Sequence, residues 1–600
     1  MLMRSHIVSM ILFTAAIGML APAVMAQQGD PPEWARGLIW YLVMPDRYWN
    51  GNTDNDPDAQ WVFGDENVPW EVSQWTSNWY ASTVKERMLQ ERFYPGAFLR
   101  QYGGDFAGLM ERLDYLSDLG VEGLILTPIF EAGSAHKFDM RSLHHADRHF
   151  GPLLTVDTTF LNREKPEDSR TWYMTSADRA FAELVEEIHR RGMRVLLMAQ
   201  FAHVSAHFWA FENLLERQEN SQFGSWFTVR QWDKPETPYD SEFDYERMWG
   251  IDAFPKLRQD TLGLVKGPRD YVFASTARWM DPNGDGDLSD GVDGWCIDLG
   301  QELPLPFWEA WAAHCRSINP KALLVNLGDG WGKSAAPFDL DRPREIGRSI
   351  HEFLLSRRFT STAFDAQMMK QRSRTTLSGS DMLFTMPGFH ETDRIASMCV
   401  NDTLPYDLRN SLAVNPQYDV GPPDATAEDL RSMLLLLQFT LPGAPVLYYG
   451  DEAGMWGGDD PDNRKPMLWP ELEYEGESVF EVTGDDAVHP VVFDSALHSY
   501  YKELIALRGK YTALRSGTMQ TLLLDDVAGL YAFVRAAGAE KVYVAVNAGD
   551  KPQQCVLSYL GLPEGIRLHD PFHDISFYTR RDAVSFVLPP RSATLLVPDQ

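Results

Sequence analysis

A regular alternation of amphipathic helices with short apolar strands most constrains the fold. Apolar side chains recur at helical spacing over 106–116 and over 181–188, and each pattern is stopped by a glycine, Gly120 or Gly192. The apolar runs VEGLILTP and MRVLLMA follow these glycines directly. Because consecutive strands joined by helices run parallel, the two units predict a parallel β-sheet.

Later apolar runs extend this pattern. VDGWCID, ALLVNL, MLFTM and APVLYYG read as further buried strands. The sequence between Leu38 and Tyr449 fits one large barrel better than several small domains. We therefore expect an α/β fold, a (β/α)8 TIM barrel.

Two stretches depart from the alternation. One follows the third predicted strand and is rich in Trp, Asp, Glu and Pro; the other carries short alternating strands near the C-terminus, typical of an antiparallel β-domain. The expected division is a signal peptide over 1–26, barrel over 27–203 and 263–513, an inserted domain over 204–262, and a C-terminal β-sandwich domain over 514–600.

The N-terminal segment predicts export. Arg4 precedes an apolar run over 7–20, and Val24-Met25-Ala26 places small residues where a signal peptidase cleaves. The alternative is a membrane anchor, but the run is short for a bilayer span, and no later stretch is long and apolar enough. We expect a secreted or periplasmic protein, cleaved after Ala26 and without a membrane span.

Charge and cysteine content exclude several classes of function. Lys and Arg number 54 against 85 Asp and Glu, a net charge of −31, which repels phosphate backbones and disfavours nucleic-acid binding. The four cysteines, Cys296, Cys315, Cys399 and Cys555, lack the spacing of a zinc knuckle or a disulfide scaffold. The oligomeric state stays open.

Five longer strings, in order along the chain, carry a family resemblance. They are IWYLVMPDRYWNGNTDND, YGGDFAGLMERLDYLSDLGVEGLILTPIFEAGSAHKFD, WMDPNGDGDLSDGVDGWCID, GFHETDR and YYGDEAGMWGGDDPDNRKPMLWP. The chain resembles glycoside hydrolase family 13, the α-amylase superfamily, and most closely its neopullulanase and cyclomaltodextrinase branch. The resemblance implies a barrel with domain B after the third strand, a C-terminal β-domain, and action on α-glucans. Such enzymes retain anomeric configuration with one carboxylate as nucleophile and another as acid/base.

At the catalytic positions that this resemblance assigns, the chain departs from the family pattern. Asp298 stands at the nucleophile position, but Cys296 replaces the arginine that holds the nucleophile ionised and aligned. Leu327 stands at the acid/base position, and leucine cannot donate a proton; Asp329 is a less favoured substitute. Glu391 occupies the position of the third carboxylate, normally an aspartate.

The sugar-binding positions are better kept. On the third strand Met198 and Ala202 replace the family's Asp and Asn, and His203 remains. The resemblance assigns substrate binding to one aromatic ring, two histidines, and an aspartate and an arginine in the eighth-strand loop: Phe138, His203, His390, Asp460 and Arg464. Trp226, Trp232 and Trp249 in the insertion either stack on glucan or, more commonly for such rings, pack in the core.

The resemblance also implies a calcium site, and the chain supplies the oxygen ligands that calcium prefers. Its residues are Asn50, Asn52, Asn55, Asp56, Gly103 and Asp105. A second calcium site is an open alternative at DPNGDGDLSDG, where four residues have the spacing of an EF-hand loop but the twelfth position is Val292: Asp281, Asn283, Asp285 and Asp287.

Three functional hypotheses follow. The first is an exported α-amylase-family protein that is impaired in hydrolysis and binds an α-glucan or maltooligosaccharide. The second is a working retaining glycosidase or transglycosylase, with Asp298 as nucleophile and Glu391 or Asp329 as acid. The third is a protein-interaction module without sugar binding. The replacements at Cys296 and Leu327 favour the first and third hypotheses, and the retained sugar-binding residues favour the first.

Overall fold

The structure, a computed structural model, describes residues 32–234, 236, 242–328, 337–341, 344–373 and 382–599. The predicted signal peptide and Asp329 lie outside these residues. In the described part of the chain, no helix has the length and apolar character needed to cross a membrane.

Eight parallel strands form the central sheet, in the order β10-β9-β8-β3-β2-β1-β12-β11. Strands that follow one another in this set along the chain are neighbours, except β10 and β11, which stand at the two ends of the order, and the last, β12, pairs in parallel with the first, β1. This is the strand order of a (β/α)8 barrel, so the predicted fold class is confirmed. The strands are β1 (Trp40–Val43), β2 (Gly123–Leu126), β3 (Arg194–Ala199), β8 (Gly294–Ile297), β9 (Leu323–Asn326), β10 (Leu340–Asp341), β11 (Phe384–Thr385) and β12 (Ala444–Tyr448).

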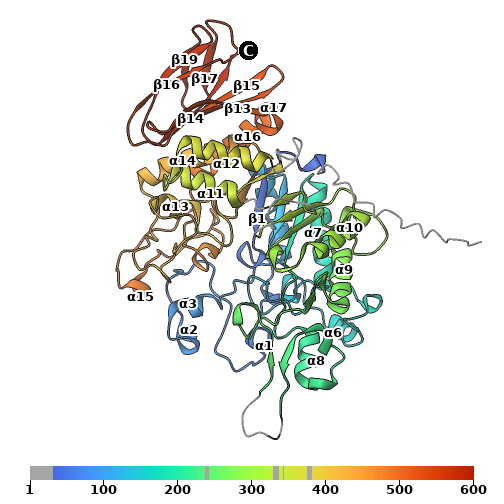
Figure 1. Ribbon diagram of the computed structural model, residues 1–600. Coiled ribbons are helices and arrows are strands. Elements are labelled where there is room, and N and C mark those ends of the chain that lie inside the picture. Colours follow the sequence, from blue (N-terminus) through green and yellow to red (C-terminus); the bar gives the residue numbers. More distant parts are fainter. Residues whose placement is uncertain are drawn as a thin grey trace, which may run out of the picture.

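Helices connect the strands and cover the barrel (Figure 1). The helix predicted around 181–188 is α7, Ser176–Arg190; Thr175 and Asp178 form a capping box at its start, and Gly192 follows it at φ +79°. The helix predicted over 106–116 is divided, because Arg112 leaves helical geometry. The other long helices are α9 (Lys266–Met280), α10 (Leu305–Ile318), α11 (Arg344–Leu354), α12 (Ser361–Ser373), α14 (Ala425–Thr440) and α16 (Ser495–Lys510), and the divided pair is α4 (Phe106–Glu111) and α5 (Leu113–Leu119).

The chain makes a long excursion between β3 and α9, at the opposite end of the molecule from the C-terminal strands (Figure 1). A bridge between His203 and Lys256 joins the two ends of the excursion beside the end of β3. Its elements are α8 (Trp209–Arg217), the β4–β5 pair (Val229–Gln231 and Asp244–Tyr245) and the β6–β7 pair (Gln259–Asp260 and Gly263–Leu264).

The C-terminal strands form a separate antiparallel β-domain with its own apolar core. Arg535 fixes it to the barrel: its guanidinium donates to the carbonyl oxygens of Thr440 at 2.8 Å and Gly517 at 3.0 Å. Tyr531 also donates to Asp365 of α12 at 3.0 Å. The six-stranded sheet contains β13 (Thr518–Asp525), β14 (Leu530–Ala537), β15 (Glu540–Asn547), β20 (Ser592–Pro598), β17 (Arg567–Asp570) and β18 (Ile575–Tyr578), beside the pair β16 (Gln553–Ser558) and β19 (Ala583–Leu588).

Candidate active site at the barrel mouth

The carboxyl ends of the barrel strands bring together three polar side chains. Asp298 follows β8 directly, and His390 and Glu391 lie in the loop after β11. One ligand atom of each of these three side chains lies within 4.8 Å of the others. The nucleophile position and the third-carboxylate position of the family pattern therefore meet at one point, at the end of the barrel where active sites form.

The carboxyl groups of Asp298 and Glu391 interact directly. Burial raises the pKa of Asp298, and a hydrogen bond with Glu391 opposes that rise. Burial and the neighbouring Asp298 carboxylate raise the pKa of Glu391 to about 8. Two acids in contact cannot both ionise readily, so Glu391 holds a proton at neutral pH.

Sequence reasoning missed the cation at this pair, which is Arg344 at the start of α11. Its Nη1 lies 2.8 Å from Oε2 of Glu391, and its Nε donates to the Leu327 carbonyl at 3.1 Å. Its guanidinium also lies 5.2 Å from the centre of the Phe389 ring. The charge of Arg344 works against the rise in the pKa of Asp298. No motif surrounds Arg344 in the sequence, so only the placement of α11 reveals it.

The positions at which the sequence predicts replaced catalytic residues are apolar and buried. Cys296 lies in register between Met198 of β3 and Val325 of β9, and burial raises the pKa of its thiol. Leu327, at the acid/base position, is buried, and its amide donates to the Ile297 carbonyl at 2.8 Å. Neither side chain is a proton donor at neutral pH.

A phenylalanine ring and several histidine rings lie near the carboxyl pair, and some of the histidine nitrogens lack a hydrogen-bond partner among the described residues. Phe138 stacks on His390, with 5.6 Å between ring centres and 16° between planes. Both ring nitrogens of His390, and Nδ1 of His203, are buried without a hydrogen-bond partner among the described residues. Burial lowers the pKa of His203 and of His136 to about 3, and that of His390 well below its usual range. Neutral imidazoles with unused nitrogens suit hydroxyl ligands.

The remaining predicted sugar-binding residues lie close to this group. Arg464 pairs with Asp460 at 3.1 Å, and its Nε donates to the His390 carbonyl at 2.9 Å. Trp249 presents its edge to His203 at 5.4 Å between ring centres and is 61% exposed. Trp226 is buried and Trp232 half-buried, so of the three tryptophans Trp249 has the most surface to offer a ligand.

The predicted calcium residues gather around Gly103, which has φ +74°. Asn50 donates to Asp56 at 2.7 Å and Asn55 to Asp105 at 2.9 Å, while the amide oxygens of both asparagines are buried without a partner in the described chain. A Cβ on Gly103 would overlap the Asp56 carboxylate. The unpaired oxygens and the carboxylates make a donor set that fits a hard cation.

Asn52 is used differently from the other predicted calcium ligands. Its Oδ1 accepts from the amide of Asp54 at 3.1 Å, as a helix cap, so its side chain is engaged in the local backbone. Burial also raises the pKa of Asp56 in this group to about 6. A bound cation would favour the ionised form of that carboxylate.

The EF-hand-like loop mostly satisfies its own backbone. Asp281 accepts from the amide of Gly286 at 3.1 Å, and Asp285 accepts from that of Asp287 at 2.7 Å. Val292 is buried in the core, and Asn283 donates to Asp290 at 3.0 Å. One oxygen each of Asp281 and Asp290 has no partner among the described residues. The second calcium site stays a prediction.

Comparison with known proteins agrees with this geometry. The family model described as "Alpha amylase, catalytic domain" matches residues 42–163. Neopullulanase 2 of Thermoactinomyces vulgaris is 28% identical over 88% of this chain and 72% of its own length. The chain is thus similar to members of the α-amylase superfamily, glycoside hydrolase family 13. A cyclomaltodextrinase of a Bacillus species is 26% identical over 89% of the chain and 77% of its own.

The fold of this chain also matches solved structures. The ligand-free cyclic α-maltosyl-(1→6)-maltose hydrolase of Arthrobacter globiformis superposes with a TM-score of 0.65 at 21% identity. The superposition covers 95% of this chain and 100% of the hydrolase. At that identity the match concerns the fold alone.

Proposed function

We propose that this protein belongs to glycoside hydrolase family 13, is exported, binds an α-glucan or maltooligosaccharide at the barrel mouth, and is impaired in hydrolysis. The observation that carries the proposal is the state of the carboxyl pair. Retaining glycosidases hold nucleophile and acid/base about 5 to 5.5 Å apart, on either side of the scissile bond. Here the acid/base position is Leu327, which cannot donate a proton, and the one carboxyl group within 4.8 Å of Asp298 among the described metal-ligand groups is that of Glu391, at the third-carboxylate position. Loss of general acid catalysis costs roughly 10² to 10⁴ in rate.

The surroundings of the pair support sugar binding. Phe138 offers an aromatic ring, and His203 and His390 offer unpartnered nitrogens. The paired Asp460 and Arg464 lie next to them. Pyranose rings present an apolar face and a rim of hydroxyls, which such a mixed surface matches. The names of the relatives, neopullulanase and cyclomaltodextrinase, point to α-glucans as the ligand class.

A slow retaining glycosidase or transglycosylase is the second candidate, and one observation favours it. Glu391, with its pKa raised to about 8, keeps a proton at neutral pH beside the Asp298 carboxyl group. This division into an acid and a nucleophile is the one that glycosidases use. In this reaction Asp298 attacks the anomeric carbon and Glu391 protonates the leaving oxygen.

We also propose that one calcium ion binds at the Gly103 turn. The buried, unpaired amide oxygens of Asn50 and Asn55 support it, together with the carboxylates of Asp56 and Asp105. The ion would hold the loop after β1 against the start of α4, since Asp105 caps that helix. Its role is structural, because these residues carry none of the proposed chemistry.

The decisive experiment measures binding and turnover on the same purified protein. Calorimetry with maltooligosaccharides, pullulan and cyclodextrins is expected to show binding, while product analysis shows turnover far below that of an active family member. Asp298→Asn and Glu391→Gln test the centre, and Asp485→Asn, in an exposed turn, is the control. Turnover of unactivated glucan that Asp298→Asn abolishes would establish the slow enzyme instead. Absence of both binding and turnover would favour a protein-interaction module.

A further inference from the structure

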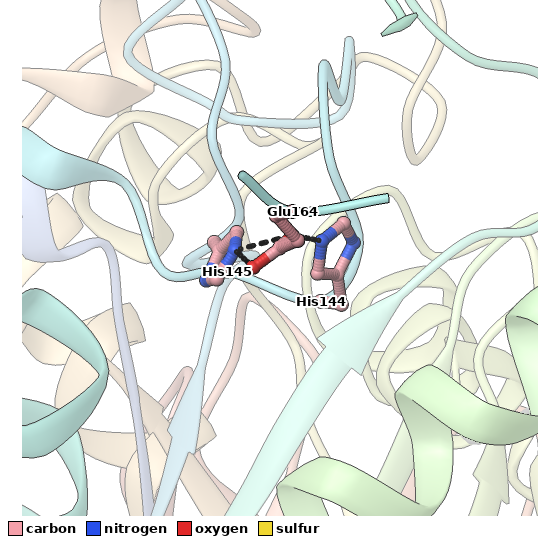
Figure 2. Close-up of side chains that lie close together, drawn as sticks. All are labelled: His144, His145 and Glu164. Carbon is pink, nitrogen blue, oxygen red and sulfur yellow. Dashed lines mark hydrogen bonds and ion pairs between the residues drawn. The ribbon is translucent and has the colours of Figure 1, made fainter. Parts of the chain in front are cut away.

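A second group of potential metal ligands lies in the long connection between β2 and α7. His144 and His145 stand on either side of Glu164, with one ligand atom of each within 4.8 Å of the others (Figure 2). Nε2 of His144 is 2.7 Å from Oε1 of Glu164, and Nε2 of His145 is 3.1 Å from the same oxygen. We propose that His144, His145 and Glu164 bind a divalent transition-metal ion, with zinc as the best match.

The donor set has the right chemistry for such an ion. Two imidazole nitrogens and one carboxylate form a recurrent set of three protein ligands for zinc, which leaves one position for a water molecule. Borderline ions such as zinc accept both nitrogen and oxygen, whereas calcium prefers oxygen alone. The proposed site is thus chemically distinct from the oxygen-rich set around Gly103.

The three side chains are buried and held in place. The side chains of His144, His145 and Glu164 are 2%, 4% and 3% exposed. Oε2 of Glu164 accepts from the amide of Tyr173 at 2.9 Å, and Oε1 is the oxygen nearer to both imidazoles, although Nε2 of His145 also lies 3.3 Å from Oε2. Trp172 stacks on His144 at 4.3 Å between ring centres and covers the site from one side.

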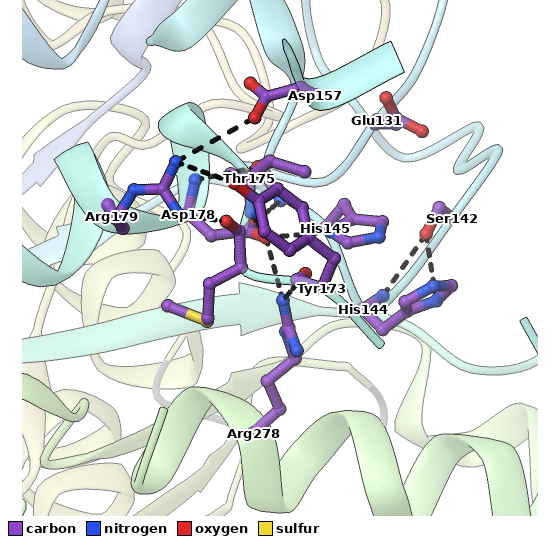
Figure 3. A network of polar contacts seen from close by, with 12 residues as sticks. Glu131, Ser142, His144, His145, Asp157, Tyr173, Thr175, Asp178, Arg179 and Arg278 are labelled. Atoms are coloured by element: carbon purple, nitrogen blue, oxygen red, sulfur yellow. Dashed lines mark hydrogen bonds and ion pairs between the residues drawn. The ribbon is translucent and has the colours of Figure 1, made fainter. Parts of the chain in front are cut away.

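The groups behind the imidazoles match the supporting shell of a metal site. Histidines that bind metals usually hydrogen-bond through their other nitrogen to a carboxylate or another fixed oxygen, which orients the ring. Nδ1 of His145 lies 2.8 Å from Asp178, and Nδ1 of His144 lies 2.7 Å from the Tyr271 hydroxyl. Both Nε2 atoms therefore face Glu164, and Figure 3 shows the contact of His145 with Asp178 on the other side of the ring.

The site would link three parts of the barrel wall. Asp178 belongs to the capping box of α7, and Arg278 of α9 donates to it at 2.8 Å and to the Tyr173 carbonyl at 2.6 Å. Figure 3 shows Arg278 reaching this cluster from below. A metal at His145 would fix the loop after β2 against α7 and α9, which stiffens the support of the barrel mouth.

The alternative is a purely hydrogen-bonded cluster, in which Glu164 accepts from both imidazoles and no ion binds. Metal analysis separates the two. The full-length protein, purified without metal-affinity steps, is freed of metal with a zinc-selective chelator in saturating calcium. Titration with zinc chloride is expected to show that one equivalent of zinc binds tightly. Bound zinc should raise Tm by at least about 2 °C. Cobalt bound in place of zinc should show the visible absorption of a tetrahedral site.

Three variants test the assignment. Glu164→Gln keeps the shape and a hydrogen-bond acceptor but removes the ligating charge, so it should fold and bind zinc at least about tenfold more weakly. His145→Gln should do the same, while His207→Gln, an exposed histidine, should bind like the wild type. No tight zinc equivalent, or zinc binding that Glu164→Gln leaves unchanged, would overturn the proposal. Neither result bears on sugar binding, which is measured separately.

Discussion

The ion pair between Arg344 and Glu391 gives the sharpest test of the electrostatics at the centre. In Arg344→Met, Glu391 and Asp298 lose the cation that faces them, at 2.8 Å from Glu391. The charge centres lie about 4 Å apart, which sets a ceiling of about 4 kcal/mol at an effective dielectric of about 20. The side chains are 27% and 33% exposed, so solvent reduces the pair to about 1 to 2 kcal/mol.

The sign of the pH dependence follows from the raised pKa of Glu391. The folded protein holds this proton up to about pH 8, above the ordinary value of 4.5, so this group lowers stability as pH rises from about 4.5 to 8. Below about pH 8 Glu391 is neutral in the folded protein, and Arg344 gains little from it. Above the window the ion pair is complete. The coupling between the two side chains should thus be small at pH 6 and largest near pH 9.

A double-mutant cycle measures this coupling. Free energies of unfolding in urea are compared for wild type, Arg344→Met, Glu391→Gln and the double variant, at pH 6 and pH 9. Because Asp298 is present in all four proteins, the cycle isolates the Arg344–Glu391 interaction. Equal coupling at both pH values would refute the raised pKa of Glu391, and zero coupling at pH 9 would refute the ion pair itself.

Three further predictions concern separate parts of the molecule. Phe138→Ala should weaken maltooligosaccharide binding roughly 2- to 10-fold in calorimetry, because aromatic stacking contributes about 0.5 to 1.5 kcal/mol; unchanged affinity would remove Phe138 from the sugar site. Gly103→Ala should abolish the calcium-dependent rise in Tm, since its Cβ would overlap Asp56; a rise equal to that of the wild type would contradict the calcium site. Arg535→Leu should lower the free energy of unfolding, measured in urea, by about 2 to 4 kcal/mol, because the carbonyls of Thr440 and Gly517 lose their hydrogen-bond donor. A change below roughly 0.5 kcal/mol, which is the scatter of neutral substitutions, would contradict this role of Arg535.

Periodicity was sufficient to predict the barrel. The apolar repeat over 181–188 and the stop at Gly192 predict α7 and β3 because burial of one helix face and an αL residue have direct sequence signatures. The sixth strand, Leu340–Asp341, was not predicted, since two residues are too few to show a period. The break at Arg112 was missed for a similar reason, because the apolar spacing continues through it.

The site could be predicted only where it follows the family pattern. Asp298 and Glu391 are found by motif, and the structure brings them together. No motif identifies Arg344, because its role depends on where α11 begins in space rather than on its neighbours in sequence. The cluster of His144, His145 and Glu164 was missed because Glu164 lies 20 positions beyond His144, and the short helix Thr155–Leu161 lies between them.

The register of β3 and β8 places Met198 directly beside Cys296. The family pattern has an aspartate at position 198 and an arginine at position 296. The substitution Met198→Asp alone would therefore place a buried charge between apolar neighbours. Such a charge costs about 3 to 5 kcal/mol. The substitution Cys296→Arg would place a cation two residues before Asp298, with which it could form an ion pair. Introducing the residues that the family pattern predicts is therefore expected to cost less stability when Cys296→Arg is made before Met198→Asp than in the reverse order.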